Sequence, residues 1–278
     1  MADEYLRKWV QNLWGDDPIP EELMPQIERL ITPSIVELDH IQKIHDWLDS
    51  LRLSKQCGRI VAPPRAGKSV TCDVYKLLNK PQKRTGKRDI VPVLYMQVPG
   101  DCSAGELLTL ILESLKYEAT SGKLTDLRRR VQRLLKESKV EMLIIDEANF
   151  LKLNTFSEIA RIYDLLKVSI VLVGTDGLDN LIKKEPYIHD RFIECYRLQL
   201  VSEKKFSELV QIWEDDVLCL PVPSNLVKRE TLIPLYQKTG GKIGLVDRVL
   251  RRAAILSLRK GLSIIDKITL DEVLEWFE

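Results

Sequence analysis

Two short groups of residues combine the side-chain types that handle phosphate groups. The first is the segment 62–69, APPRAGKS, which lies between a short apolar run and a helical pattern. In a strand–loop–helix context the backbone N–H groups of such a loop bind phosphate oxygens, Lys68 reaches the β and γ phosphates, and Ser69 ligates Mg²⁺. The segment therefore predicts a P-loop that binds ATP through Pro64, Arg65, Ala66, Gly67, Lys68, Ser69 and Val70.

The loop departs from the usual G-x-x-x-x-G-K-[ST] pattern at its first position. Ala62 stands where a glycine is usual, so the start of the loop must adopt a backbone conformation that a Cβ atom tolerates. Gly67, Lys68 and Ser69 retain the part of the pattern that touches phosphate. The alternative is an accidental G-K-S loop in a basic stretch, and the flanking strand and helix patterns argue against it.

The second group is a pair of carboxylates, Asp146 and Glu147, at the end of an apolar run. Such a run is typical of a parallel strand buried on both faces, which delivers the acids at its C-terminal end. We expect Asp146 to hold Mg²⁺, directly or through water, and Glu147 to polarise the water that attacks the γ phosphate. Either acid alone is also compatible with a helix cap. Together they favour an ATPase over a phosphotransferase, because a small-molecule kinase needs no glutamate to activate water.

The elements that must position these groups alternate between strands and helices. Apolar runs predict strands at 58–61, 91–98, 141–146, 169–175 and 196–200. Helical periodicity marks the segments 37–53, 104–118, 124–139 and 155–167. The alternation implies an α/β fold with a parallel sheet and right-handed crossovers.

The chain divides near two prolines, Pro221 and Pro223, beyond which every periodic segment is helical. We therefore expect a lead-in at 1–36, an α/β ATPase core at 37–220 and a small helical lid at 221–278. A length of 278 residues with 45% hydrophobic residues suits one such core and a small appendage.

Composition limits the cellular setting and the partners. The net charge is only +1, so any nucleic-acid binding must come from a local patch. The five scattered cysteines form no C-x-x-C motif and favour reduced thiols in a cytosol. There is no signal-peptide pattern and no run of about 18 apolar residues, so we expect a cytoplasmic protein without membrane contact. The histidines lack zinc-ligand spacing, which leaves nucleotide-bound Mg²⁺ as the only implied metal.

The basic segment 121–136 has apolar residues on one face of a helical pattern and Lys and Arg residues on the other faces. Lys123 precedes the helix and, with a backbone N–H at the helix N-terminus, is a candidate phosphate contact. Arg128 and Arg129 are the other candidates. No aromatic residues lie between these basic side chains, so contacts to the phosphates of duplex DNA are favoured over stacking on the nucleobases of a single strand. A solvated basic helix face is the alternative.

The order of these parts resembles the AAA+ ATPases, a superfamily of P-loop NTPases with a helical lid. Thr175 stands where that superfamily places its first sensor, a polar residue that hydrogen-bonds the attacking water or the γ phosphate. Arg191 matches the arginine finger that completes a neighbouring subunit's site. The alternatives are a threonine that merely ends a strand and a surface arginine near a helix end.

The chain more closely resembles the TnsC and TniB regulators of DNA transposition, and in particular the short TnsC of CRISPR-associated transposons. The segments that carry this resemblance are 45–49, 140–148, 170–176, 220–222, 224–226 and 241–244. It implies an ATPase that assembles as a helical filament or hexameric ring on double-stranded DNA. It also implies that the assembly connects TniQ and an RNA-guided Cas effector to the transposase TnsB. Relatives carry a second sensor arginine where this chain has Leu245, with Lys242 and Arg248 nearby.

Two other classes of function stay open from the sequence. One is a helicase loader or replication-initiation ATPase, whose partner would be a replicative helicase. The other is a nucleotide-gated scaffold that assembles on ATP binding without hydrolysis. Ala62 and Leu245 keep the second class open, and they also favour hydrolysis that is slow or stimulated by a partner.

Overall fold

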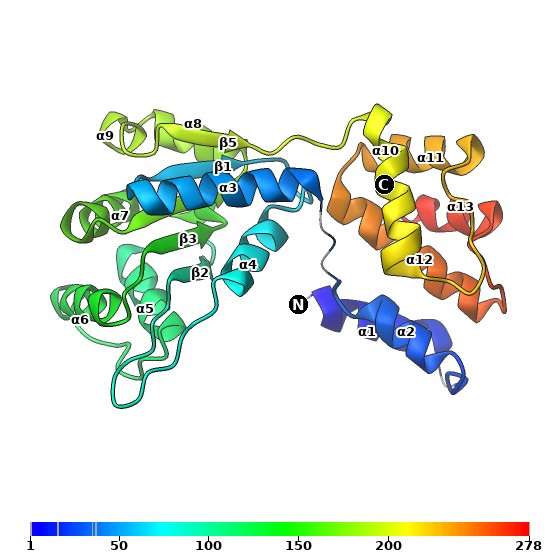
Figure 1. Ribbon diagram of the computed structural model, residues 1–278, viewed down its shortest axis with the longest axis horizontal. Coiled ribbons are helices and arrows are strands. Elements are labelled where there is room, and N and C mark those ends of the chain that lie inside the picture. The colour runs from blue at the N-terminus through cyan, green and yellow to red at the C-terminus, as the bar shows by residue number, and fades with distance from the viewer. Residues whose placement is uncertain (1, 16, 35, 37, 278) are drawn as a thin grey trace. The chain divides into compact units, whose positions relative to one another are not determined.

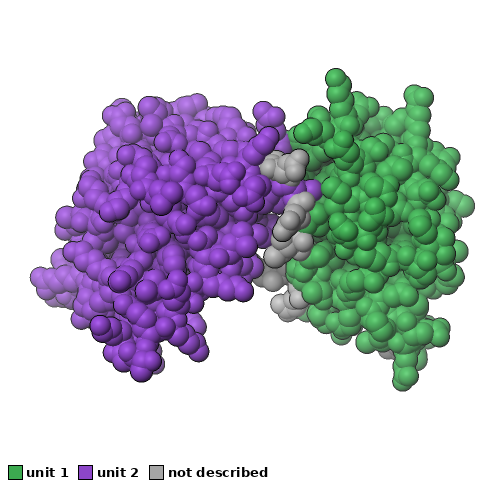
Figure 2. Space-filling view, viewed as in Figure 1, with its two compact units in different colours: residues 1–37, 200–278 green, residues 38–199 purple. Residues whose placement is uncertain are grey.

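The computed structural model describes residues 2–15, 17–34, 36 and 38–277, with only the backbone described for 2–5, 39 and 40. The chain forms two compact units (Figure 2). The core unit comprises Leu38–Gln199, and the helical unit comprises Met1–Glu37 together with Leu200–Glu278. Each unit is described by itself.

A five-stranded sheet in the order β2-β3-β4-β1-β5 organises the core unit (Figure 1). Its strands are β1 (Gly58–Val61), β2 (Val93–Gln97), β3 (Met142–Asp146), β4 (Ser169–Gly174) and β5 (Glu194–Arg197). Every strand pair is parallel. The chain leaves β1 in one direction across the sheet and returns past it to β5, so the switch point lies between β1 and β4. In such sheets ligands bind outside the carboxyl ends of the strands at the switch point.

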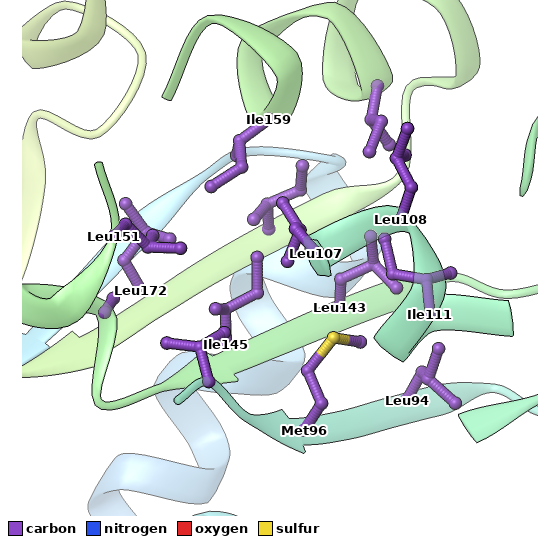
Figure 3. Close-up of a cluster of buried hydrophobic side chains, with 14 of the residues drawn as sticks. Leu94, Met96, Leu107, Leu108, Ile111, Leu143, Ile145, Leu151, Ile159 and Leu172 are labelled. Carbon is purple, nitrogen blue, oxygen red and sulfur yellow. The ribbon is translucent and has the colours of Figure 1, made fainter. Parts of the chain in front are cut away.

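Helices cover both faces of this sheet. The helices of the core unit are α3 (Asp39–Ser54), α4 (Lys68–Leu78), α5 (Ala104–Ser114), α6 (Leu124–Glu137), α7 (Leu153–Leu166), α8 (Asp176–Lys183), α9 (Pro186–His189) and the short 3₁₀ helix η1 (Ala148–Phe150). Alternate strand residues such as Leu94, Leu143 and Leu172 pack against α5 and α7 in one buried cluster (Figure 3). The opposite face of β2 and β4 contacts α4.

The start of α5 illustrates how local sequence fixes these elements. Ser103 and Glu106 form a capping box, in which each side chain accepts the other residue's backbone N–H. A capping box satisfies two of the donors that a helix start leaves unpaired. The buried side of α5 is then supplied by Leu107, Leu108 and Ile111, which are fully buried.

The helical unit joins the two ends of the described chain. Its elements are α1 (Ala2–Trp14), α2 (Met24–Ile31), α10 (Glu203–Ile212), the π-helical segment η2 (Trp213–Leu218), α11 (Arg229–Thr239), α12 (Ile243–Arg259) and α13 (Lys267–Glu275). The buried Arg251 of α12 donates to the Leu30 carbonyl of α2 at 2.8 Å. Arg29 likewise donates to the Leu218 carbonyl at 2.6 Å. These bonds tie the segment before α3 to the C-terminal helices.

The α/β fold and the parallel sheet are confirmed, and the first four strands lie where the apolar runs predict them. The fifth begins earlier than predicted, at Glu194, because it pairs with β1 from Gly58↔Glu194 to Val61↔Arg197. The units also differ from the predicted segments. The helical unit takes in Leu200–Glu278 rather than 221–278 alone, and Val201 donates to the Gly241 carbonyl at 3.1 Å. Of the predicted boundaries, residues 1, 37 and 278 lie outside the described residues.

The described residues include no helix that is both long and apolar enough to cross a membrane. All five cysteine thiols are free. Cys57, Cys72 and Cys102 are buried, whereas Cys219 is exposed.

Candidate functional site

The P-loop connects the end of β1 to the start of α4 at the carboxyl edge of the sheet. Ala62 extends β1, because its N–H donates to the Gly174 carbonyl of β4 at 3.1 Å. The left-handed residues of the loop are Arg65, with φ 64°, and Gly67, with φ 96°. Ala62 is not among the positive-φ residues, so its Cβ atom introduces no left-handed strain where the usual pattern has glycine.

The first turn of α4 offers unpaired backbone donors. The first backbone hydrogen bond of the helix runs from the Thr71 N–H to the Gly67 carbonyl at 3.0 Å. In the described part of the chain, no backbone carbonyl accepts a hydrogen bond from the N–H groups of Gly67, Lys68, Ser69 and Val70. Unpaired donors at a helix N-terminus form a site for an anion, and the helix dipole adds to it.

The ammonium group of Lys68 lies across the start of the loop. Its Nζ donates to the carbonyls of Ala62 and Pro63, each at 3.0 Å. Burial lowers the pKa of Lys68, and the charges of Glu147 and Asp146 oppose that shift. An ammonium has three N–H donors, so two bonds to the loop leave one for a phosphate oxygen.

Asp146 ends β3 with a fully buried carboxylate. Its Oδ1 accepts the Glu147 N–H at 2.8 Å, and its Oδ2 accepts the Tyr95 hydroxyl at 2.8 Å. Burial and then the Asp146 charge raise the pKa of Tyr95 above its usual range. The phenol therefore stays protonated and donates a hydrogen bond to the carboxylate.

Glu147 follows directly in the left-handed conformation, with φ 55° and ψ 33°. For a residue with a Cβ atom this conformation costs about 1–3 kcal/mol and is concentrated at functional sites. The charges of Glu147 and Asp146 both favour the protonated form of Lys68. The two predicted acids therefore lie at the same edge of the sheet as the P-loop, close enough for their charges to act on its lysine.

Thr175 follows β4 and so lies between the ends of β1 and β3. Its N–H donates to Oδ1 of Asn149 in η1 at 3.4 Å. Asn149 also lies against Gly174, where an added Cβ atom would come within 3.0 Å of its Oδ1. This amide links the turn after Glu147 to the end of β4.

The structure thus brings together Lys68, Ser69, Asp146, Glu147 and Thr175 at one edge of the sheet. The set comprises a lysine, hydroxyl groups, two carboxylates and a cradle of N–H groups. The lysine and the N–H groups fit a nucleoside triphosphate, and the oxygen atoms fit a hard cation. Tyr95 and Asn149 also belong to this edge. Sequence reasoning missed both, since each is one polar residue in an ordinary strand or turn.

Arg191 lies away from this group, before the first residue of β5. Its guanidinium forms two bonds with Asp164 of α7, at 3.3 and 2.9 Å, and donates to the Tyr187 carbonyl at 2.6 Å. The hydrogen bond with Asp164 raises the pKa of Arg191. The structure therefore does not bring Arg191 to the P-loop of its own subunit.

The three DNA-contact candidates have different environments. Lys123 is exposed directly before α6, and the Arg129 side chain is 83% exposed. Arg128 instead donates twice to Oε2 of Glu158 in α7, at 2.8 and 2.6 Å, and that carboxylate is buried. Arg128 therefore joins α6 to α7, whereas Lys123 and Arg129 face solvent.

The lid residues discussed above belong to the helical unit. Lys242 directly precedes α12, and Leu245 and Arg248 lie in its first turns.

Comparison with known proteins gives a family and a fold. The profile of the family described as bacterial TniB protein matches residues 27–200, more than half of the chain. No curated protein matches.

Several solved structures share the fold. Cdc6p from Pyrobaculum aerophilum has a TM-score of 0.68 and 18% identity, and the match covers 86% of this chain and 68% of that chain. ORC2 from Aeropyrum pernix in ADPNP–ADP complexes has a TM-score of 0.66 and 11% identity, covering 90% and 71%. ORC1 from Aeropyrum pernix in complex with DNA has a TM-score of 0.65 and 12% identity, covering 91% and 69%. At these identities the likeness shows the fold alone, which is that of AAA+ ATPases.

Proposed function

The chain belongs to the family of bacterial TniB proteins, and from this premise we propose that it is an ATP-dependent regulator of DNA transposition. In this proposal the protein binds ATP with Mg²⁺ and assembles on double-stranded DNA as a helical filament or hexameric ring. The assembly connects target selection by TniQ and an RNA-guided Cas effector to the transposase TnsB. The CRISPR-associated subtype rests on the resemblance of the segments quoted from the sequence.

One observation carries the nucleotide part of the proposal. The unpaired N–H groups at the start of α4 lie at the same sheet edge as Lys68, Asp146 and Glu147. The loop N–H groups and the free N–H of Lys68 would bind the phosphates. Ser69 and Asp146 would hold Mg²⁺, which when bound neutralises charge that develops on the phosphate oxygens.

Hydrolysis requires a base beside the γ phosphate. Glu147 is the candidate, because it is only partly buried and adjoins the fixed carboxylate of Asp146. It would accept the proton of the attacking water. The backbone N–H of Thr175 donates to Asn149, and the Thr175 hydroxyl would hydrogen-bond that water or the γ phosphate.

The site would be completed by a neighbouring subunit. Arg191 is anchored at the start of β5, whereas the P-loop follows the end of β1. An arginine supplied in trans stabilises charge in the transition state of phosphoryl transfer. Hydrolysis would then weaken the contact between subunits, so the nucleotide state would set how long the assembly persists.

The DNA contact would be made through phosphates. Lys123 and Arg129 are exposed at the start of α6, and phosphate contacts position a protein without reading sequence. Target choice would therefore come from partners, and the similarity of the fold to ORC1 in complex with DNA is compatible with duplex binding.

Two variants test the proposal. Lys68→Ala should lower ATP affinity in calorimetry by at least about tenfold, because hydrogen bonds to charged groups contribute about 1.5–3 kcal/mol. Glu147→Gln should retain ATP binding and prolong the lifetime of oligomers on DNA. Wild-type affinity in Lys68→Ala, or an unchanged lifetime in Glu147→Gln, would contradict the proposal.

The other two classes predict different outcomes. A helicase loader would bind a replicative helicase rather than TnsB. A scaffold without hydrolysis would release no phosphate with or without duplex DNA, although ATP would still assemble it. A measurement of phosphate release and a measurement of binding to purified TnsB therefore distinguish the three classes of function.

A further inference from the structure

One hydroxyl holds the carboxylate to which the proposed function assigns Mg²⁺. The Tyr95 hydroxyl donates to Oδ2 of Asp146 at 2.8 Å. Tyr95 belongs to β2, and Asp146 ends β3. The hydrogen bond therefore joins two neighbouring strands at the edge of the sheet that carries the P-loop.

The strand register explains why this tyrosine reaches the site. Gln97 is the register partner of Asp146, and Tyr95 lies two residues before it on the same face of the sheet. Neighbouring strands are about 4.8 Å apart, so a tyrosine that leans along its strand can span the diagonal. Lys76 Nζ of α4 lies over the Tyr95 ring, 5.7 Å from its centroid.

The direction of the hydrogen bond follows from the groups involved. An ionised carboxylate can only accept a hydrogen bond, so the Tyr95 hydroxyl is the donor and Oδ2 of Asp146 is the acceptor.

Two hydrogen bonds fix the carboxylate. Oδ1 of Asp146 is held by the Glu147 N–H and Oδ2 by Tyr95, so the orientation of the group is set from both sides. Each carboxylate oxygen has two lone-pair sites. The bond from Tyr95 leaves one on Oδ2 for a cation or for a water bound to it.

We propose that Tyr95 is a positioning residue that orients the Asp146 carboxylate for the divalent cation bound with ATP. The inference rests on the proposed nucleotide site and adds a residue to it. Partners that orient metal ligands typically change metal affinity by about 10–100-fold when they are removed. Loss of the hydroxyl should therefore weaken the dependence of nucleotide binding on Mg²⁺ and leave metal-free binding unchanged.

The test is Tyr95→Phe, which keeps the ring and removes only the hydroxyl. Calorimetry with a non-hydrolysable ATP analogue, in Mg²⁺ and in EDTA, gives the factor by which Mg²⁺ strengthens binding. We expect this factor to fall by about tenfold or more in Tyr95→Phe, with the affinity in EDTA unchanged. Tyr75→Phe is the matched control, because Tyr75 donates to Asp49 at 2.7 Å within the same unit.

The outcomes separate the inference from the function on which it rests. If the wild-type protein binds the analogue equally with and without Mg²⁺, the proposed site itself fails. If the wild-type protein responds to Mg²⁺ and Tyr95→Phe responds equally, the inference is overturned. Equal weakening in Mg²⁺ and EDTA also overturns it, because the hydroxyl would then only support the fold. Thermal unfolding of both variants reports that structural cost, which we expect to be similar for the two.

Discussion

Arg191 and Asp164 form a bidentate ion pair at the edge of the sheet where the strands begin. The pair lies just before β5, whose first residue Glu194 pairs with Gly58 at the start of β1. Lys68 follows the other end of β1, which spans four residues or about 13 Å. Arg191 therefore lies at the opposite end of β1 from the P-loop of the same chain, so a part in catalysis would have to be a contribution in trans.

A mixing experiment tests this arrangement. Lys68→Ala and Arg191→Ala should each abolish DNA-stimulated phosphate release, since an arginine finger contributes about 10³–10⁵-fold to the rate. A 1:1 mixture should regain activity, because about one quarter of head-to-tail contacts would then combine an intact P-loop with an intact arginine. Arg161→Ala, an exposed arginine on the same helix as Asp164, is the control. A mixture as inactive as its components would argue against sharing.

Removal of Arg129 should weaken DNA binding through its charge alone. Its side chain is 83% exposed, so Arg129→Ala should leave the thermal midpoint unchanged. The slope of log affinity for duplex DNA against log salt concentration should become shallower by about one, and it should do so uniformly across DNA sequences. Lys123→Ala should behave in the same way. Fluorescence anisotropy over a series of salt concentrations measures the slope, and an unchanged slope in both variants would exclude this surface.

Removal of the adjacent Arg128 should instead destabilise the protein. Arg128→Ala leaves the carboxylate of Glu158 buried without its two charged donors. We expect a loss of about 2 kcal/mol in the free energy of unfolding, since leaving a buried charged acceptor unpaired costs about 1–3 kcal/mol or more. Urea denaturation of Arg128→Ala and Arg129→Ala compares two neighbouring arginines of one helix. Equal stabilities would contradict the assignment of Arg128 to packing.

The contrast between these arginines shows what the sequence can and cannot predict. The strands, the P-loop and the acid pair follow from local patterns, because apolar runs and fixed spacings determine them. Arg128 and Arg129 are consecutive arginines in one basic run, and only the packing of α6 on α7 distinguishes them. Local sequence does not contain that packing.

Tyr95 and the fifth strand depend on pairing between distant segments. Tyr95 reaches Asp146 through the register of β2 on β3, and a sequence gives no register between strands. The start of β5 at Glu194 is likewise set by its pairing with β1. The C-terminal part of the helical unit begins at Leu200 rather than at the prolines, because contacts such as that of Val201 with Gly241 join segments that are far apart in the chain.

A buried charge cluster around Asp179 gives the final prediction, a dependence of stability on pH. Asp179 is 3% exposed and accepts hydrogen bonds from Arg59 at 2.8 Å, from Lys183 at 2.9 Å and from Arg197. Burial alone would raise the pKa of Asp179, but the hydrogen bonds from Lys183, Arg59 and Arg197 outweigh it and lower the pKa from 3.8 to about 2. Its stabilising contribution is therefore fully present above about pH 4 and is lost as the pH falls towards about 2.

Asp179→Asn should destabilise the protein by about 3 kcal/mol at pH 7, because it leaves the buried Arg59 guanidinium without its carboxylate. The difference from the wild type should shrink by about 2 kcal/mol as the pH falls from about 4 to about 2, since the wild-type carboxyl group is then protonated as well. Urea denaturation of both proteins at several pH values measures the difference. Asp126→Asn, whose carboxylate is exposed and 4.0 Å from Arg129, should show almost no change at any pH. A constant difference for Asp179→Asn across this range would mean that the carboxylate of Asp179 is not stabilised by its three cations.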